Sequence, residues 1–345
     1  MINENEILKC LENAGFKDNI SGLRVDEQEN ISFVIEIDPA QGAEIESLRQ
    51  KAESAVKNLG INGDVRAILT AKKGTSGPKS KPALIEDLAP NIKHIIAIAS
   101  GKGGVGKSTV AVNLAITLAR LGYKTGLMDA DIYGPSIPTM LGVRGKPDIT
   151  DEKLIPHEEH GIKLISMGFL VEEEKPMIWR GPMIQTALRQ FLVDVNWGEL
   201  DYLIVDMPPG TGDAQLTMAQ KVPLAGAVIV STPQDVALID ARKGLNMFRQ
   251  VGVPVLGIIE NMSVYTCPSC GHEEHIFGHG GAQKEAKKMA CNFLGALPLE
   301  LDIRIAGDTG KPAVVSAPNS TYGKAFEMIA ENITEQVKSA KRARA

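Results

Sequence analysis

From residue 94 onward, apolar residues occur in short unbroken runs instead of alternating with polar ones. Five such runs lie at residues 95–98, 125–128, 202–205, 227–230 and 255–259. Strands that are buried on both faces, as in a parallel sheet, have this pattern. Helical periodicity separates several of the runs, for example over residues 110–121 and 236–250. Strands that alternate with helices predict an α/β domain with a mostly parallel sheet and helices on both faces.

The first 71 residues predict a small separate α+β domain. Apolar positions at helical spacing cover residues 5–16 and 43–59, and strand-like runs cover 20–26, 31–37 and 64–70. The order is αββαβ, with a hairpin between the first two strands. Residues 72–82 then hold four lysines, two prolines, two glycines and two serines. That composition predicts a flexible linker, taken as residues 72–92, before the larger domain at 93–337 and a basic tail at 338–345.

Composition excludes several classes of protein. Among 345 residues, 43% are hydrophobic, which is typical of a globular chain, and the net charge is −5. A mildly acidic chain is poorly suited to bulk binding of nucleic acid. No apolar stretch reaches the roughly 18–20 residues of a membrane span, and the polar start MINENEILK predicts no signal peptide. With only four cysteines, we expect no disulfide framework, a cytoplasmic location and no stable membrane association.

A glycine-rich motif follows the first apolar run. It reads Gly101-Lys-Gly-Gly-Val-Gly106-Lys107-Ser108-Thr109, which matches G-x-x-x-x-G-K-[ST] between a predicted strand and a predicted helix. Its backbone N–H groups can wrap phosphate oxygens, Lys107 can reach the β- and γ-phosphates, and the Ser108 hydroxyl can ligate Mg²⁺. The motif predicts a nucleotide site. Its predicted nucleotide-binding residues are Gly101, Lys102, Gly103, Gly104, Val105, Gly106, Lys107, Ser108 and Thr109.

Carboxylates follow two of the predicted strands. Asp129 and Asp131 close the second run, and Asp206 closes the run at 202–205. Asp206 is predicted to hold Mg²⁺ with Ser108, and Asp131 to orient the attacking water. The Pro-Pro-Gly turn after Asp206 places Gly210 where its backbone N–H could contact the γ-phosphate. For Asp129, a structural role is as well supported as a functional one.

Two cysteines at metal-ligand spacing, Cys267 and Cys270, lie in a polar segment. Two thiolates do not complete a [4Fe–4S] cluster, which takes four, but two copies of the chain would supply them. His275 and His279 follow and extend the pattern to Cys-x2-Cys-x4-His-x3-His, which is close to a zinc-knuckle spacing. Spacing alone leaves iron–sulfur chemistry and zinc open.

The larger domain resembles the Mrp/ApbC family of P-loop ATPases, within the MinD, ParA and nitrogenase iron-protein superfamily. The matching segments are SGKGGVGKST (100–109), DADIYGPSIP (129–138), WRGPM (179–183), DYLIVDMPPGTGD (201–213), STPQDVALIDARKG (231–244), ENMS (260–263), CPSC (267–270) and FGHGG (277–281). The resemblance implies a homodimer that binds ATP, hydrolyses it slowly and carries a [4Fe–4S] cluster on Cys267 and Cys270 for transfer to apoproteins. Apo client proteins and cluster-assembly factors are the implied partners.

The same resemblance implies roles for two further residues. Lys102 is expected to reach across the dimer to the partner's nucleotide and to act in catalysis with Lys107 and Asp131. Asn261 is expected to bond the adenine edge. The first domain weakly resembles a unit found in iron–sulfur assembly factors, and we assign it no catalytic residue.

Two other functions remain open from the sequence. One is a positioning ATPase of the MinD/ParA kind with a structural zinc knuckle. Its membrane helix would be the C-terminal segment, where Phe326, Ile329, Ile333 and Val337 form an apolar stripe. Glutamates occupy the opposite face, so a helix packed on the core is the better interpretation. The other is an ATP-coupled electron donor like the nitrogenase iron protein.

Overall fold

The computed structural model describes residues 4–16, 20–25, 30–37, 45–59, 61, 63–71, 88–131, 134–169 and 181–344. The chain forms two compact units, residues 1–83 and 84–345. The boundary falls inside the predicted linker, most of which lies outside the described residues. The first unit has the predicted αββαβ order. Its elements are α1 (Glu4–Leu11), a π-helical turn η1 (Glu12–Phe16), β1 (Ile20–Val25), β2 (Ile31–Ile37), α2 (Ile45–Lys57) and β3 (Val65–Ala71).

The first unit is held by one small core. Its sheet has the order β1-β2-β3, with β1 antiparallel and β3 parallel to β2. Ile7 and Leu11 of α1 pack with Phe33 of β2 and Val56 of α2, all fully buried. Because these residues stand at helical spacing on the helices and at every second position on the strand, the pattern of the sequence predicts this core.

The second unit is an α/β domain, as predicted. Its elements begin with β4 (Ile92–Ala99), α3 (Lys107–Arg120), β5 (Thr125–Asp129), α4 (Ile137–Leu141), β6 (Ile149–Thr150), β7 (Lys153–Leu154), β8 (His157–Glu159), β9 (Ile162–Ser166), the 3₁₀ turn η4 (Met167–Phe169) and α5 (Gly181–Val193). They continue with β10 (Leu200–Asp206), α6 (Asp213–Lys221), β11 (Leu224–Ser231), α7 (Asp235–Gln250), β12 (Val255–Glu260), β13 (Tyr265–Thr266) and β14 (Glu273–Glu274). The last are α8 (Gly281–Lys288), β15 (Phe293–Ala296), α9 (Leu301–Thr309), α10 (Ala313–Ser316) and α11 (Thr321–Arg344).

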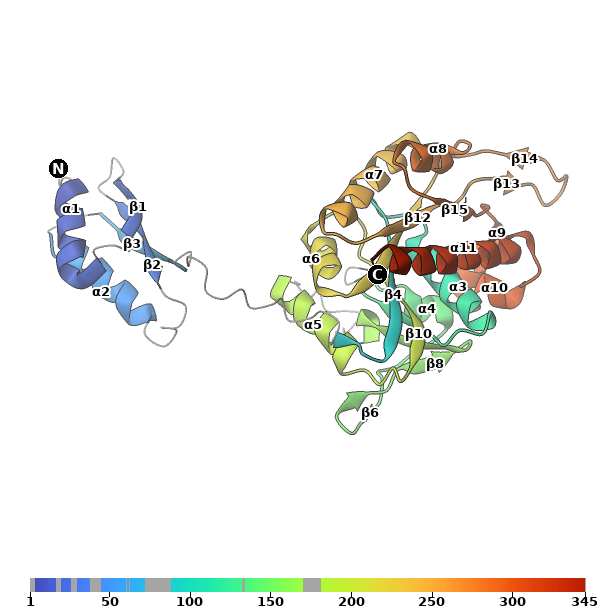
Figure 1. Ribbon diagram of the computed structural model, residues 1–345, viewed down its shortest axis with the longest axis horizontal. Helices are drawn as coiled ribbons and strands as arrows, with labels where there is room; N and C mark the ends of the chain where they lie inside the picture. The colour runs from blue at the N-terminus through green and yellow to red at the C-terminus, as the bar shows by residue number, and fades with distance from the viewer. Residues whose placement is uncertain are drawn as a thin grey trace. The chain divides into compact units, whose positions relative to one another are not determined.

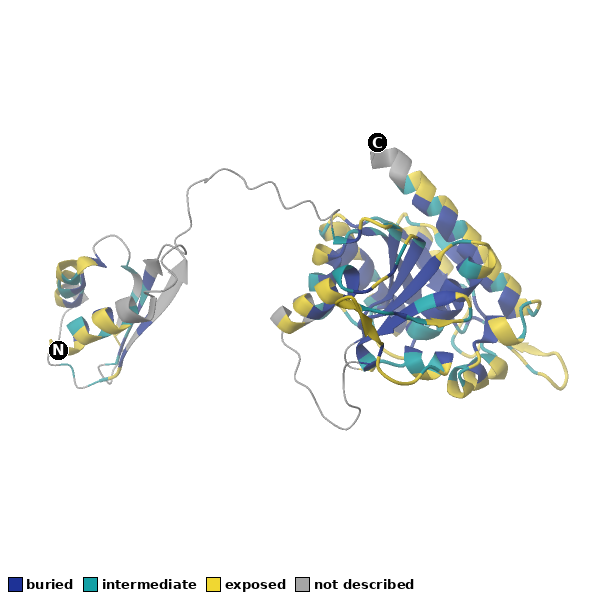
Figure 2. Cartoon of the chain, turned by 90° about the horizontal axis from the view of Figure 1, so that it is seen from below, coloured by how far each residue is buried: buried dark blue, intermediate teal, exposed yellow. Residues whose placement is uncertain are grey.

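Eight of these strands form one sheet with the order β15-β12-β11-β4-β10-β5-β9-β8. All neighbouring strands pair in parallel except β8 and β9. Helices cover both faces, with α3 packed on α11 and with α5, α6, α7 and α8 packed in succession (Figure 1). Figure 2 shows the strands as the buried centre of this unit.

Three predicted boundaries differ from the structure. Ile92 belongs to β4 and Ala89 is buried, so the larger unit begins before residue 93. Helix α11 continues to Arg344, so the predicted tail at 338–345 is mostly helical. The helix-like pattern of residues 284–293 predicts a helix that includes Cys291, but α8 ends at Lys288 and Cys291 lies between α8 and β15.

The C-terminal helix packs on the core, as its apolar stripe predicts. Phe326, Ile329, Ile333 and Val337 are all buried, whereas the glutamates of the opposite face are exposed. Among the helices in the described part of the chain, none has both the length and the apolar character needed to cross a membrane.

Candidate functional site

The glycine-rich loop joins the central strand β4 to α3, which begins at Lys107. Two of its glycines, Gly104 and Gly106, have left-handed φ angles of 80° and 81°. At Gly106 a Cβ atom would lie only 2.2 Å from the Asn261 side-chain nitrogen, so any other residue would have to displace Asn261 and would be strained by the positive φ. Val105 is buried, whereas Gly103 and Gly104 are exposed. The backbone at these two exposed glycines is therefore accessible to a ligand.

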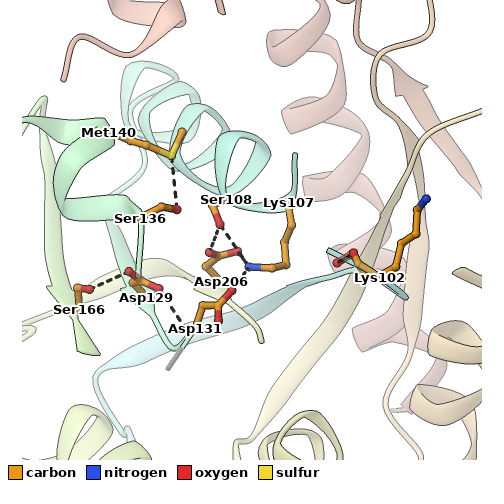
Figure 3. A network of polar contacts seen from close by, with 10 residues as sticks. Lys102, Lys107, Ser108, Asp129, Asp131, Ser136, Met140, Ser166 and Asp206 are labelled. Atoms are coloured by element: carbon orange, nitrogen blue, oxygen red, sulfur yellow. Dashed lines mark hydrogen bonds and ion pairs between the residues drawn. The ribbon is translucent and has the colours of Figure 1, made fainter. Parts of the chain in front are cut away.

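The predicted magnesium and phosphate residues converge in the structure (Figure 3). Lys107 Nζ lies 2.7 Å from Asp206 Oδ1 and 3.4 Å from Asp131 Oδ2. The Ser108 hydroxyl donates to Asp206 Oδ2 at 2.6 Å. Lys107 is only 6% exposed and Asp206 is fully buried. A lysine, a hydroxyl and two carboxylates thus meet beside the loop at the carboxyl ends of β4, β5 and β10, where α/β proteins bind their ligands.

Asp129 lies behind this cluster and is held by two hydrogen bonds. The Asp131 backbone N–H donates to Asp129 Oδ1 at 3.2 Å, and the Ser166 hydroxyl donates to Oδ2 at 2.7 Å. Burial, together with the nearby Asp206 carboxylate, raises the pKa of Asp129 to about 8. Burial also raises the pKa of Asp206, against the lowering effect of Lys107. Asp129 is therefore harder to ionise than an ordinary carboxyl, and its bond with the Asp131 N–H holds Asp131 in place.

Other predicted residues have partners that the sequence did not indicate. The Gly210 N–H donates to the Ser100 carbonyl at 3.0 Å, so it must leave that bond to contact a phosphate. The Asn261 side-chain NH₂ donates to the Val105 carbonyl at 2.8 Å, and Asn261 is only 7% exposed. Its predicted bond to adenine remains a prediction. Lys102 points away from the Lys107 cluster (Figure 3), and its predicted contact with a partner chain's nucleotide stays a prediction. Gly101 and Thr109 are partly buried at the two ends of the loop.

The cysteine pair occupies the turn of a short hairpin. Strands β13 and β14 have two residues each, and Cys267 and Cys270 lie between them. The Cys267 N–H donates to the His272 carbonyl at 2.9 Å, and the Gly271 N–H donates to the Cys267 carbonyl at 2.8 Å. Backbone N–H groups of Ser269 and Cys270 lower the pKa of Cys267, which favours the thiolate that binds metal. Cys270 is exposed.

The two histidines do not join the two cysteines. His275 and His279 contact each other, with ring centroids 4.2 Å apart, and His275 Nδ1 lies 3.1 Å from the Ser263 carbonyl oxygen. Within the described residues, no group of three or more His, Cys, Asp or Glu side chains is arranged to hold a metal ion. In this arrangement the four side chains of the predicted zinc-knuckle pattern are not gathered around one point, and the choice between zinc and iron stays a matter for experiment.

The other two cysteines have structural environments. The Cys10 thiol on α1 donates to the Ala55 carbonyl at 3.2 Å. Cys291 packs against the main core, and burial raises its pKa. Burial disfavours the thiolate of Cys291, and the hydrogen bond to Ala55 occupies the thiol of Cys10. The two cysteines of the hairpin are therefore the ones suited to binding a metal.

Comparison with known proteins gives consistent matches. Residues 91–334 match the family model described as ParA, NUBPL iron-transfer P-loop NTPase. An "iron-sulfur cluster carrier protein" of Pseudomonas fragi is 53% identical over 256 residues, covering 73% of this chain and 89% of that protein. The mouse "iron-sulfur cluster transfer protein NUBPL" is 49% identical over 301 residues, covering 86% of this chain and 87% of that protein.

Two solved structures support the fold. A nucleotide-binding protein from Archaeoglobus fulgidus, solved in complex with ADP, has 43% identity and a TM-score of 0.60. The match covers 66% of this chain and 91% of the Archaeoglobus fulgidus chain. The cell division ATPase MinD of Pyrococcus furiosus has 23% identity and a TM-score of 0.55, covering 70% of this chain and 99% of its own. The second likeness concerns the fold alone.

Proposed function

Because the chain belongs to the family of NUBPL iron-transfer P-loop NTPases, we propose that it is an ATP-dependent carrier of [4Fe–4S] clusters. Two copies bind one cluster between them and transfer it to apoproteins. The names of the relatives support this function over a positioning ATPase or an electron donor. Client apoproteins and cluster-assembly factors are its proposed partners, and the cytoplasm is its proposed location.

The exposed cysteine pair on the hairpin is the observation that carries this proposal. One chain offers two thiols there, and a [4Fe–4S] cluster takes four thiolates. A second copy related by twofold symmetry supplies the other two. The lowered pKa of Cys267 favours metal binding, and the exposure of Cys270 gives a recipient access to the cargo.

The nucleotide site has the groups that ATP with Mg²⁺ requires. Ser108 and Asp206 would hold Mg²⁺, which neutralises charge on the phosphate oxygens. The fit rests on their 2.6 Å hydrogen bond and on Asp131 Oδ1, which is buried without a hydrogen-bond partner in the described part of the chain. Lys107, now paired with Asp206 and Asp131, would turn to the β- and γ-phosphates. The residues of this cluster are thus the groups that Mg²⁺ and the phosphates would contact.

Hydrolysis follows from the same arrangement. Asp131, held by its backbone bond to Asp129, would orient the attacking water. Lys102 of the partner chain would stabilise the charge that develops on the transferred phosphoryl group. The Gly210 N–H would exchange the Ser100 carbonyl for the γ-phosphate and return on hydrolysis.

The test is anaerobic reconstitution of the full chain with iron and sulfide, followed by an absorbance spectrum and iron and zinc analysis. We expect broad absorbance near ~400 nm and about four irons per two chains. Both are lost in Cys270→Ser. Cys291→Ser is the matched control, because Cys291 is a half-buried thiol outside the hairpin, and it should leave the iron content unchanged.

Two results would refute the proposal. One is a full cluster in a Cys267→Ser, Cys270→Ser double variant. The other is about one zinc per chain that depends on His275 or His279. In the second case the chain would be an ATPase whose hairpin is structural.

A further inference from the structure

A four-residue segment, Glu260–Ser263, lies between the nucleotide loop and the cysteine hairpin. It begins at the end of β12 and leads directly into the hairpin. Its second residue, Asn261, contacts the nucleotide loop through the hydrogen bond from its side chain to the Val105 carbonyl. The Asn261 backbone N–H also donates to the Ser231 carbonyl at the end of β11. The entry to the hairpin is thereby fixed to the loop and to the sheet.

The exit of the hairpin returns to the same four residues. His275, directly after β14, lies with Nδ1 at 3.1 Å from the Ser263 carbonyl oxygen. The backbone N–H of Ala282, in the first turn of α8, donates to Glu260 Oε2 at 2.7 Å. Glu260 is only 3% exposed, so this bond is buried. Both ends of the hairpin are therefore attached to one short segment, which also holds the nucleotide loop.

The segment is itself held firmly. The Ser263 N–H and hydroxyl both donate to the Leu297 carbonyl at 2.9 Å. The Leu297 N–H in turn donates to the Glu260 carbonyl at 2.8 Å. Farther along, Arg242 of α7 makes a two-point ion pair with Glu285 of α8, at 2.6 and 3.0 Å. A displacement of the segment therefore moves the base of the hairpin with it.

We propose that Asn261 and His275 are positioning residues for the cysteine pair, through which the occupancy of the nucleotide loop sets the exposure of Cys267 and Cys270. The inference rests on the proposed function for the identity of the nucleotide. Phosphate binding draws the backbone N–H groups of the loop inward, and Val105 lies in that loop. The bond from Asn261 to Val105 transmits this displacement to the segment Glu260–Ser263. The contact between His275 and Ser263 transmits it to β14, the second strand of the hairpin.

The test measures alkylation of the thiols in the full, reduced, cluster-free chain, with and without ATP and Mg²⁺. Peptide mass spectrometry after iodoacetamide treatment gives a rate for each cysteine, and the half-buried Cys291 serves as an internal reference. We expect the nucleotide to change the rate at Cys270 by about fivefold or more, the lower end of typical couplings between sites. In Asn261→Ala and in His275→Ala this ratio should fall to about one.

His275→Ala is the sharper variant, because His275 is exposed and lies away from the nucleotide loop. We expect it to fold and to bind ATP as the wild type does, so only the nucleotide effect on the thiols is lost. Asn292→Ala is the matched control. Asn292 also donates its side-chain NH₂ to a backbone carbonyl, that of Leu256, and its other side-chain partner in the described part of the chain is Gln336, away from the loop and the hairpin. It should keep the full ratio.

Two outcomes would overturn the inference. One is a wild-type chain whose thiol rates do not respond to the nucleotide. The other is a His275→Ala chain that keeps the wild-type ratio. Iron content separates this result from failure of the proposed function, since a wild-type chain with about four irons per pair but no response refutes the coupling alone.

Discussion

At the scale of single residues, the site gathers more carboxylates than its lysine can neutralise. Asp129, Asp131 and Asp206 all approach Lys107, and two of them are fully buried. Burial of like charges favours protonation of one member, and we expect the proton on Asp129, whose pKa is raised to about 8 and which makes no ion pair with Lys107 among the described residues. Asp129 is then neutral while Asp131 and Asp206 remain available for a ligand.

Replacement of Asp129 by Asn tests this assignment through the pH dependence of stability. The folded pKa of about 8 lies above the ordinary 3.8, so the folded chain keeps a proton that the unfolded chain releases. Stability of the nucleotide-free wild type therefore falls as the pH rises from about 4 to about 8, by on the order of 1 kcal/mol per pH unit. Asp129→Asn should lose this contribution, as measured by urea unfolding across that range. A pH-independent difference between the two proteins would contradict the assignment.

Lys102 gives a second prediction at this scale. If it acts on the partner's nucleotide, Lys102→Ala should slow ATP hydrolysis by about 100-fold or more and leave ATP binding nearly unchanged. Lys124→Ala is a suitable control, because Lys124 is an exposed lysine whose ammonium pairs with the surface carboxylate of Glu199. Steady-state turnover and equilibrium binding distinguish the two roles. Unchanged turnover in Lys102→Ala would exclude the role across the dimer.

At the scale of elements, helices α4 and α9 meet through two glycines. In the chain, α4 comes after Asp131, and α9 comes after the cysteine hairpin. Gly142 and Gly310 end α4 and α9, both with φ of 69°. A Cβ atom on Gly310 would lie 2.6 Å from Gly142 Cα, inside any real contact distance. The backbones of α4, which follows Asp131 in the chain, and α9 therefore pack without an intervening side chain.

Gly310→Ala should destabilise the chain by about 2 kcal/mol or more, since it combines a left-handed φ with a backbone clash. Gly122→Ala separates the two causes. Gly122 also has a positive φ, of 93°, but a Cβ there meets no atom within 4 Å. It should lose only about 1 kcal/mol. Denaturant midpoints measure both, and equal losses would mean that the contact between the two glycines contributes little.

Periodicity predicted the central strands but missed some at the edges. The continuous apolar runs became β4, β5, β10, β11 and β12 because both faces of each are covered. Strand β9 was missed because Lys163 interrupts its apolar run, and β15 because it has only four residues. Without β9, the sequence could not indicate that Ser166 bonds Asp129.

The candidate site was likewise predictable from the sequence only in part. The spacing of the glycine-rich motif predicted Lys107 and Ser108 at the start of a helix that follows a strand, and the strand ends bring Asp131 and Asp206 beside them, while their roles stay predictions. The partners of Asn261 and Glu260 were not predictable, since they depend on register between segments far apart in the chain. A buried Glu-Asn pair at a strand end was the available signal, and it was interpreted only for Asn261.

At the scale of the whole molecule, the chain has two units with separate cores. The fully buried residues of the first unit contact one another, and those of the second form their own larger core. The family match also lies within the second unit. Each unit therefore has the contacts needed to fold by itself.

A chain of residues 84–345 should accordingly fold and bind ATP without the first unit. We expect its melting temperature to lie within about 3 °C of the corresponding transition in the full chain. Calorimetry and equilibrium nucleotide binding test this. Loss of a cooperative transition in the shortened chain would show that the second unit depends on the first.

The hairpin that carries the cysteines is exposed along nearly its whole length, and its strands have only two residues each. On the proposed function, a cluster held at this turn would lie at the surface of its chain, within reach of a recipient protein. The same openness leaves the Cys270 thiol facing solvent, three residues from the more readily ionised Cys267. We therefore expect oxidants to attack this pair before the half-buried Cys291, so a bound cluster would also shield the thiols that hold it.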